Sequence, residues 1–204
     1  MSIRAVIWDL GGVLVRTEDY TSRDRLAARL GLSREELEDV VFSKDSGDRA
    51  QLGLISVEQH SENLRQRFGL QRSEMDRFWK DFWGGDRLDA ELVTFIRSLR
   101  ACYKTGLLSN AFSDLRHYVT HVWKFADAFD EMVISAEVGL VKPDAQIYHL
   151  ALQRLGVAPQ EAVFIDDMPR NVEGARAANM HAIRFLSPQQ ARSELEQLLN
   201  GGIG

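Results

Sequence analysis

Short apolar runs alternate with amphipathic segments over most of the chain. The runs hold few polar residues, as strands that are buried on both faces of a parallel sheet do. The predicted strands are residues 3–8, 103–108, 131–134, 162–165 and 182–186. Helices are expected between and after them, at about 89–100, 112–122, 144–155, 170–179 and 188–199. This alternation predicts an α/β fold with a doubly wound parallel sheet of the Rossmann type.

Residues 16–84 follow a different pattern, because apolar side chains recur there every three or four positions and proline is absent. The clearest case is a row of large apolar side chains that would share one helix face, namely Met75, Phe78, Trp79, Phe82 and Trp83. We interpret the two tryptophans as core residues of this helical region. Gly84 and Gly85 then predict a flexible join. The expected organisation is an α/β core of residues 1–15 and 85–204, with a helical insertion at 16–84.

The composition of the 204 residues, 45% hydrophobic and 27% charged, is typical of a globular protein with a sizeable core. The net charge of −5 argues against a nucleic-acid partner, which requires clustered lysine and arginine. Apolar runs stay well short of the ~20 residues of a membrane-spanning helix, and the N-terminal run is too short for a signal peptide. The single cysteine, Cys102, excludes an internal disulfide. We expect a cytoplasmic protein without a membrane partner, and no pattern indicates its oligomeric state.

Polar side chains follow the predicted strands at the edge of the sheet where function collects in such folds. Asp9 ends the first strand, Ser109-Asn110 follow the second, and Asp166-Asp167 follow the fourth. Lys142 comes shortly after the third, in the segment GLVKPD. Each group alone could be a turn former or a helix cap. Together they predict one site that combines carboxylates, a hydroxyl and an ammonium group.

This combination suits phosphoryl transfer. A carboxylate such as Asp9 can attack phosphorus and form an aspartyl-phosphate, which water then hydrolyses. Lys142 would balance the charge on the phosphoryl oxygens, and Ser109 and Asn110 would bind the same group. The expected substrate is a small phosphorylated metabolite, for example a sugar phosphate.

A carboxylate nucleophile and a phosphate repel each other, so this chemistry also predicts a Mg²⁺ ion between them. Asp9, Asp167 and the backbone carbonyl of Gly11 are the expected ligands. Asp166 would stand behind them and orient Lys142 or a metal-bound water. Asn171 either hydrogen-bonds at this site or caps the following helix.

At these residues the sequence resembles the haloacid dehalogenase (HAD) superfamily, in the branch with a helical cap inserted after the first strand. WDLGGVLV is similar to the first motif of that family, with Asp9 as nucleophile, and LLSN to the second, with Ser109 as phosphate ligand. VGLVKPDAQIY resembles the third, with Lys142, and FIDDMPRNVEGARAANM the fourth, with Asp166 and Asp167. The resemblance covers nearly the whole chain and is closest to sugar-1-phosphate phosphatase-like proteins and to the phosphatase domain of soluble epoxide hydrolases. It implies a Mg²⁺-dependent hydrolase whose cap, residues 16–84, selects the substrate.

One residue departs from the family pattern. The first motif usually has a second aspartate two residues after the nucleophile, as general acid for the leaving group, and Gly11 stands there instead. Because a positioned general acid contributes ~10²–10⁴-fold in rate, its loss favours leaving groups that are already good, such as an anomeric hydroxyl or an acyl group. Glu18 and Asp19 are candidate replacements, although the start of a helix also explains both.

Two other functions stay open. A haloacid dehalogenase would use Asp9 to attack carbon without a metal, but an aromatic residue is then expected in place of Gly11, and the Asp166-Asp167 pair is not. A phosphate-binding or regulatory protein with weak catalysis would explain Gly11 as lost chemistry. A zinc site at His117 and His121 is disfavoured, because the pair lacks the glutamate of a zinc-protease helix.

Overall fold

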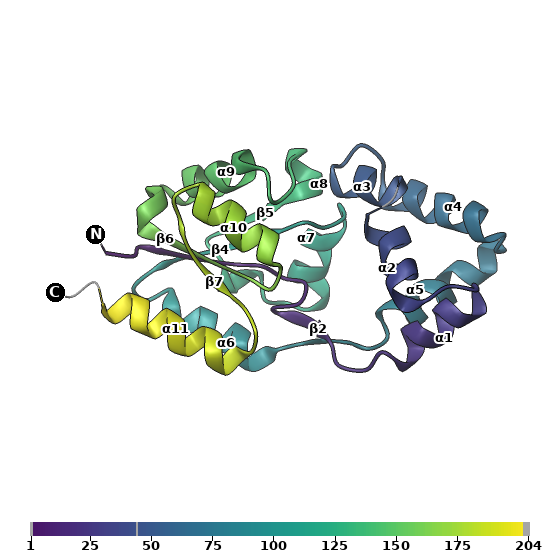
Figure 1. The fold of residues 1–204 in the computed structure, drawn as a ribbon, viewed down its shortest axis with the longest axis horizontal. Coiled ribbons are helices and arrows are strands. Elements are labelled where there is room, and N and C mark those ends of the chain that lie inside the picture. The colour runs from purple at the N-terminus through teal and green to yellow at the C-terminus, as the bar shows by residue number, and fades with distance from the viewer. Residues whose placement is uncertain (1, 44, 202–204) are drawn as a thin grey trace.

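The computed structural model describes residues 2–43 and 45–201 and has two parts, an α/β core and a helical insertion (Figure 1). The core is built on a sheet of five parallel strands. They are β1 (Ala5–Trp8), β4 (Lys104–Ser109), β5 (Glu131–Ile134), β6 (Ala162–Asp166) and β7 (His181–Arg184). All the strands predicted for the core are therefore present, with ends that agree to within two residues.

β1 lies in the middle of the sheet, whose strand order is β5-β4-β1-β6-β7. In register, Trp8 of β1 lies beside Leu107 of β4 on one side and Ile165 of β6 on the other. The chain builds the sheet outward from β1 to β4 and β5, and then crosses back to β6 and β7. The strand order thus reverses at β1, so its carboxyl end is the point at which sheets of this kind bind ligands.

Each face of the sheet carries its own apolar cluster. Val6 and Trp8 of β1 belong to the cluster with α6 (Ala90–Leu99), α7 (Leu115–His117) and α11 (Pro188–Asn200). Ala5 and Ile7 belong to the other, with α9 (Ala145–Leu155) and α10 (Pro169–Ala177). Burial on both faces explains why the β1 segment is apolar throughout. The predicted doubly wound α/β fold is confirmed.

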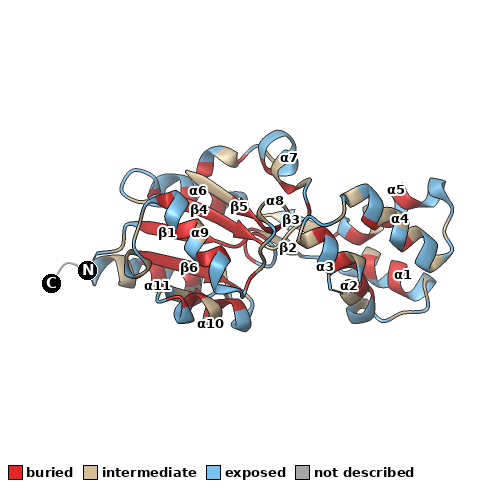
Figure 2. Cartoon of the chain, turned by 90° about the horizontal axis from the view of Figure 1, so that it is seen from above, coloured by how far each residue is buried: buried red, intermediate tan, exposed pale blue. Residues whose placement is uncertain are grey.

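Among the described residues, five α-helices form the insertion (Figure 2). They are α1 (Thr21–Arg29), α2 (Arg34–Phe42), α3 (Ser46–Gln51), α4 (Val57–Phe68) and α5 (Met75–Trp83). Capping boxes at Ser33 and Ser56 fix where α2 and α4 begin. The helices bury a cluster of their own around Leu26, Leu37 and Phe78. α2 and α3 lie on the side of the insertion that faces the core (Figures 1 and 2).

The two crossings between core and insertion pair as an antiparallel ribbon, β2 (Val15–Thr17) with β3 (Asp86–Leu88). The prediction of a flexible join is wrong at Gly85, which is buried in a close contact between two backbones. The other backbone is that of residues 18 and 19. The N–H of Glu18 donates to the Gly85 carbonyl at 3.0 Å, and a Cβ on Gly85 would overlap the carbonyl oxygen of Asp19. The glycine therefore allows a tight crossing and not a loose one.

The helix predicted at 112–122 begins later than expected. α7 begins at Leu115 and continues as the π-helical turn η2 (Tyr118–Val122), whereas Phe112 packs in the apolar cluster of the insertion. Four further short segments are η1 (Arg72–Glu74), η3 (Ala126–Ala128), α8 (Ser135–Val138) and η4 (Pro159–Glu161). None of the helices in the described part of the chain is long and apolar enough to cross a membrane.

Candidate active site

Asp9 directly follows β1 at the point where the strand order reverses, and it is 6% exposed. Its Oδ1 accepts the N–H of Leu10 at 2.7 Å and lies 2.8 Å from Nζ of Lys142. Oδ2 accepts no hydrogen bond from a described residue, which leaves one carboxylate oxygen available for attack. Burial raises the pKa of Asp9 to about 8, and the ammonium of Lys142 opposes this rise. The charged carboxylate therefore depends on positive charge beside it.

Lys142 supplies that charge from the loop between α8 and α9. Its Nζ lies 2.8 Å from Asp9 and 2.7 Å from Oδ2 of Asp166, which ends β6. Burial alone would lower the pKa of Lys142, but the two carboxylates outweigh it and hold the pKa above its usual value. The amine is thus a fixed cation between two carboxylates and is not a proton donor at neutral pH.

Asp166 is fully buried and saturated with donors besides Lys142. The side-chain Nδ2 of Asn171 donates to both of its oxygens, at 3.1 and 3.0 Å, and the N–H of Met168 donates at 2.8 Å. Asn171 lies inside α10, so of the two roles expected for it the structure shows the hydrogen bond at the site. The hydroxyl of Tyr148 in turn donates to the Asn171 carbonyl at 2.8 Å. These contacts orient Asp166 toward Lys142.

Asp167 completes a cluster of three carboxylates. One oxygen each from Asp9, Asp166 and Asp167 lies within 4.8 Å of the others, and it is the one group of potential metal ligands of this kind among the described residues. Burial raises the pKa of Asp167, and the charge of Asp166 raises it further. Gly12 has a φ of +77°, and a Cβ there would overlap the Asp167 carboxylate. Gly12 therefore leaves room for the Asp167 carboxylate. The clustered carboxylate oxygens are suitable ligands for a divalent cation.

The segment after β4 holds the other predicted site residues. Ser109 is 3% exposed, and its hydroxyl makes no hydrogen bond to a described residue, so it is available to a ligand. Asn110 pairs with the backbone of Lys142: its Nδ2 donates to the carbonyl at 3.0 Å and its Oδ1 accepts the N–H at 2.8 Å. The Asn110 side chain thus positions Lys142, and the phosphate contact expected of Asn110 stays a prediction.

Ser135 is a site residue that the sequence analysis missed. It is fully buried at the start of α8, and its Oγ accepts the N–H of Ala111 at 2.9 Å and donates to the Ala111 carbonyl at 3.2 Å. It therefore pins the segment that carries Ser109. The available signal was its place as the first polar residue after β5, the same signal that identified Asp9 and Ser109.

Gly11 is exposed, its φ lies outside the left-handed region, and a Cβ built on it would meet no atom within 4 Å. Neither the backbone nor the available space therefore excludes an aspartate at this position. Of the two candidate replacements, Asp19 accepts the N–H of Thr21 at 2.9 Å at the start of α1, and hydrogen bonds to Thr21 lower its pKa. A carboxyl with a lowered pKa is a poor general acid, so Asp19 fits the helix start better. Glu18 is exposed.

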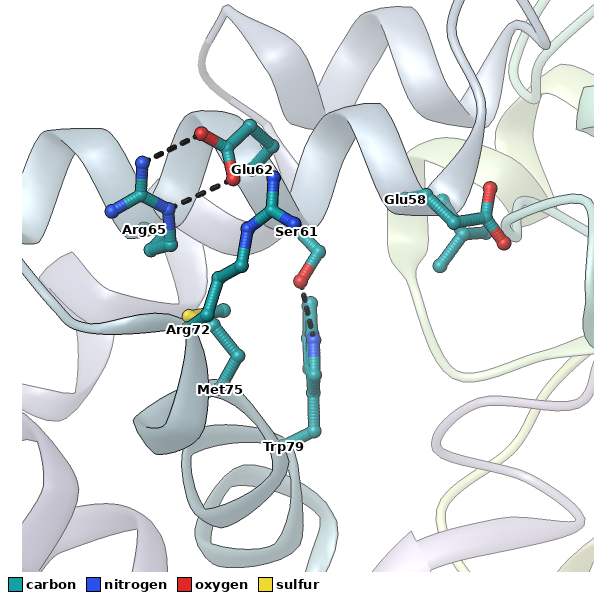
Figure 3. A pocket seen from close by; sticks show the side chains of 8 residues that line it. Glu58, Ser61, Glu62, Arg65, Arg72, Met75 and Trp79 are labelled. Carbon is teal, nitrogen blue, oxygen red and sulfur yellow. Dashed lines mark hydrogen bonds and ion pairs between the residues drawn. The ribbon is translucent and has the colours of Figure 1, made fainter.

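Several other features lie away from this site. His117 and His121 are exposed, with ring centroids 5.1 Å apart, and they belong to no group of three potential ligands among the described residues. A cavity of about 290 Å³ lies between α4 and α5 (Figure 3). Arg65 and Glu62 pair with each other along its wall, and Trp79 donates to Ser61 at 3.1 Å. None of the carboxylates of the site lines this cavity, so the chemistry is to be sought at the sheet edge.

The sequence model of the haloacid dehalogenase-like hydrolase family matches residues 3–179, which is most of the chain. The chain belongs to this family. Family membership accounts for the order of the four strand-end motifs, and it confirms the resemblance inferred from them.

Individual members of the family are similar over nearly the whole chain. The sesquiterpene phosphatase astK of Aspergillus oryzae is 26% identical over 203 residues, which cover 97% of both chains. A predicted HAD-like family hydrolase of Porphyromonas gingivalis has a TM-score of 0.77 and 25% identity, and covers 97% of this chain and 99% of that one. A HAD family enzyme of Bacteroides thetaiotaomicron, solved with magnesium and inorganic phosphate, has a TM-score of 0.73 and 22% identity over 89% and 93% of the two chains. The chain is thus a hydrolase with phosphatases among its relatives.

Proposed function

We propose that this hydrolase is a Mg²⁺-dependent phosphatase that acts on a small phosphorylated organic molecule through an aspartyl-phosphate on Asp9. The observation that carries the proposal is the cluster at the switch point. Three carboxylates converge there with the buried ammonium group of Lys142, which lies 2.8 Å from Asp9 and 2.7 Å from Asp166. The phosphatase among the relatives that match the whole chain supports the same reaction.

In the proposed reaction a carboxylate oxygen of Asp9 attacks phosphorus, and the bond from phosphorus to the ester oxygen breaks. The leaving group departs with the electron pair of that bond. Water then attacks phosphorus, releases inorganic phosphate and restores the Asp9 carboxylate. Lys142 favours the charged form of Asp9 and orients its carboxylate for the attack, and the hydroxyl of Ser109 donates to a phosphoryl oxygen.

Asp9, Asp167 and the Gly11 carbonyl would hold the Mg²⁺ ion, with Asp166 behind them. The ion, when bound, offsets the repulsion between the nucleophile and the phosphoryl oxygens. These donors fit Mg²⁺, because the ion prefers oxygen ligands, carboxylates among them. Three carboxylates cluster here, and the Lys142 cation contacts two of them. Magnesium in the related solved structure supports this assignment for the present chain.

Gly11 shapes the choice of substrate. Without an aspartate at this position, the leaving group receives no proton from the first motif, so the proposed substrates are those with good leaving groups, including anomeric and acyl phosphates. We assign residues 16–84 as the cap domain that selects among them, and residues 1–15 and 85–204 as the catalytic core. Support comes from the separate apolar cluster of the insertion and from its place above the carboxyl ends of the strands.

A substrate panel tests the proposal. The purified chain is incubated with acyl, sugar and aryl phosphates, with Mg²⁺ or with EDTA, and released phosphate is measured. We expect release only with Mg²⁺, and loss of release in Asp9→Asn. Asp19→Asn is the matched control, because it removes an exposed aspartate near the same linker and should retain most of the activity.

Two other results would point to the rival functions. Release of chloride from 2-chloropropionate without metal would identify a dehalogenase, in which Asp9 attacks carbon. Tight binding of phosphate esters with no turnover on any member of the panel would identify a phosphate-binding or regulatory protein. Either result would contradict the proposed phosphatase.

A further inference from the structure

Three aromatic rings meet where the insertion approaches the core. Phe42 ends α2, Trp83 ends α5, and Phe112 lies in the segment after β4. The ring centroid of Phe42 is 5.6 Å from that of Trp83 and 6.2 Å from that of Phe112. Phe42 therefore joins a ring of the insertion to a ring of the core. We call these three residues the aromatic joint.

The aromatic joint lies beside the candidate active site. Phe112 comes two residues after Asn110, whose amide is bonded to the Lys142 backbone, so their Cα atoms are at most about 7 Å apart. Ala111 between them is fixed to Ser135. The rings that contact Phe112 thus lie over the end of β4, the same sheet edge from which Asp9 projects.

The aromatic joint leaves ring surface exposed. Trp83 is 39% exposed, although its spacing in α5 predicts a core position, and Phe42 is half-buried. The prediction that both tryptophans belong to the core is therefore wrong for Trp83, while Trp79 packs against the cluster of the insertion. Tyr20, 40% exposed at the other linker, lies near the same point, since both its ring and that of Trp83 lie within about 6 Å of the Arg23 guanidinium. Trp83 and Tyr20 thus bring exposed aromatic surface together near the linkers, which makes this surface a candidate for binding.

Arg23, the charged group next to these rings, is already paired, whereas His60, whose ring centroid lies 5.0 Å from that of Phe112, keeps a buried Nε2 without a partner among the described residues. Arg23 is 5% exposed, and its guanidinium donates to the Phe82 carbonyl at 2.9 Å, to Glu38 at 2.7 Å and to Asp86 at 2.9 Å. Asp86 also accepts the hydroxyl of Thr17 at 2.6 Å. A substrate with many hydroxyl groups needs free donors and acceptors, and this cluster offers few of them. The ring faces are the surface that remains free.

We propose that the organic part of the substrate is apolar, and that it packs against Trp83 and Phe42 of the aromatic joint while the phosphate is held at Asp9, Lys142 and Ser109. The substrate class is a phosphate ester of an aromatic group, whose aryl oxide is a good leaving group, in preference to a sugar phosphate. This inference rests on the proposed function for the place of the phosphate, and it adds the chemical nature of the rest of the molecule. Trp83 is the specificity-determining residue.

Binding of two phosphonates that cannot be hydrolysed tests the inference without relying on turnover. Calorimetry with the full chain and Mg²⁺ compares 1-naphthylmethylphosphonate with methylphosphonate. We expect the naphthyl compound to bind at least tenfold more tightly to the wild type. Trp83→Ala should remove about tenfold of this preference, which corresponds to about 1.4 kcal/mol and is typical of a lost aromatic contact. Trp83→Phe should keep most of it, because a ring remains.

Tyr118→Ala is the matched control, because Tyr118 is 42% exposed on the core surface and does not belong to the aromatic joint. It should leave the preference unchanged within twofold. Equal affinity of the wild type for the two phosphonates, or an unchanged preference in Trp83→Ala, would overturn the inference.

Turnover separates this inference from the proposed function. The wild type should show a higher kcat/KM for 1-naphthyl phosphate than for glucose 1-phosphate, and Trp83→Ala should lose about tenfold on the first and less than twofold on acetyl phosphate. Phosphate release that is faster on the sugar would overturn the apolar substrate and leave the phosphatase intact. A naphthyl preference in binding with no phosphate release from any ester would contradict the phosphatase and leave the apolar site intact.

Discussion

The sheet edge and the aromatic joint above it are built from opposite kinds of side chains. At the edge, Lys142 lies 2.8 Å from Asp9 and 2.7 Å from Asp166, and all three side chains are almost completely buried. At the aromatic joint, Phe42 and Trp83 leave ring surface exposed, and the nearby Arg23 has its donors engaged. The charged region is buried around the paired Lys142, whereas the apolar region leaves ring surface exposed.

This difference predicts separate roles for the two regions in catalysis and in substrate selection. The charged groups act on the phosphoryl group, which is the same in every phosphate ester, so a change there should affect all substrates alike. The rings would contact the part of the substrate that varies, so a change there should affect substrates unequally. Each variant below tests one side of this comparison.

Lys142→Met should have the largest effect. It leaves two buried carboxylates without their shared cation, which costs about 3–5 kcal/mol of the free energy of unfolding, and it should lower kcat by about 10²–10³-fold on every substrate. Urea unfolding and steady-state kinetics measure the two effects. Lys104→Met, at an exposed lysine that begins β4, is the control and should change neither quantity appreciably. A loss of rate confined to one class of ester would contradict these separate roles.

Asp167→Asn should abolish Mg²⁺-dependent activity and yet stabilise the metal-free protein. Burial raises the pKa of Asp167 above 3.8 in the fold, so the folded state holds its proton more tightly than the unfolded state does. The wild type therefore loses stability as pH rises above that value, and the variant, which has no proton to lose there, does not. At neutral pH in EDTA we expect a melting temperature about 2–4 °C higher, the shift that about 1 kcal/mol produces in a chain of this size.

Two controls accompany this measurement. The difference between variant and wild type should vanish near pH 3, where both carry a neutral group. Mg²⁺ should raise the melting temperature of the wild type and not that of the variant, because an ion that binds only the folded state stabilises it. A lower melting temperature of Asp167→Asn than of the wild type at neutral pH in EDTA would contradict this account. It would show that the Asp167 charge does not destabilise the metal-free cluster.

Gly11→Asp should raise activity by about tenfold on alkyl phosphates, whose leaving groups are poor, and little on acyl phosphates. The structure offers space for the new side chain, since a Cβ at this position meets no atom within 4 Å. Gly12→Ala is the contrasting variant: it should lose activity on all substrates, because its Cβ overlaps Asp167 and its φ is +77°. Equal gains of Gly11→Asp on good and poor leaving groups would refute a general-acid role for this position.

Phe112→Leu should give the smallest effect. Phe112 belongs to the α/β core along the chain, but its ring is 8% exposed and packs in the apolar cluster of the insertion. Loss of the ring should therefore lower the free energy of unfolding by about 1–2 kcal/mol. We expect KM for 1-naphthyl phosphate to rise about threefold and kcat on acetyl phosphate to stay within twofold. Leu115→Ala, a core position of α7 outside the aromatic joint, is the control for a loss of packing alone. A threefold rise in KM with this control as well would assign Phe112 to packing only.

The strands and the charged residues could be predicted from the sequence because their signals are local. An apolar run that ends in a polar residue predicts both a buried strand and the position at which the strand reaches the sheet edge, as at Asp9 and Ser109. Parallel strands bring those ends together, so Lys142 and Asp166 meet Asp9 although they are far apart along the chain.

The remaining features depend on contacts that no local pattern records. The ribbon of β2 and β3 consists of three-residue strands about 70 positions apart, and its pairing shows only in the fold. Phe112 looks like the start of a helix, but its ring packs into the insertion. Trp83 shares the helical spacing of Phe78 and Phe82, yet it lies where α5 leaves the insertion and so remains exposed. Helical periodicity gives the direction of a side chain and not what lies opposite it.

The aspartyl-phosphate on Asp9 is tested most directly by trapping it. The full chain is mixed with Mg²⁺ and a substrate that it turns over, then quenched and reduced with borohydride, which converts an aspartyl-phosphate into homoserine. Peptide mass spectrometry then locates the product. We predict homoserine at position 9 only when substrate and Mg²⁺ are both present, and none in Asp9→Asn. Continued release of phosphate with no homoserine at position 9 would contradict the central claim.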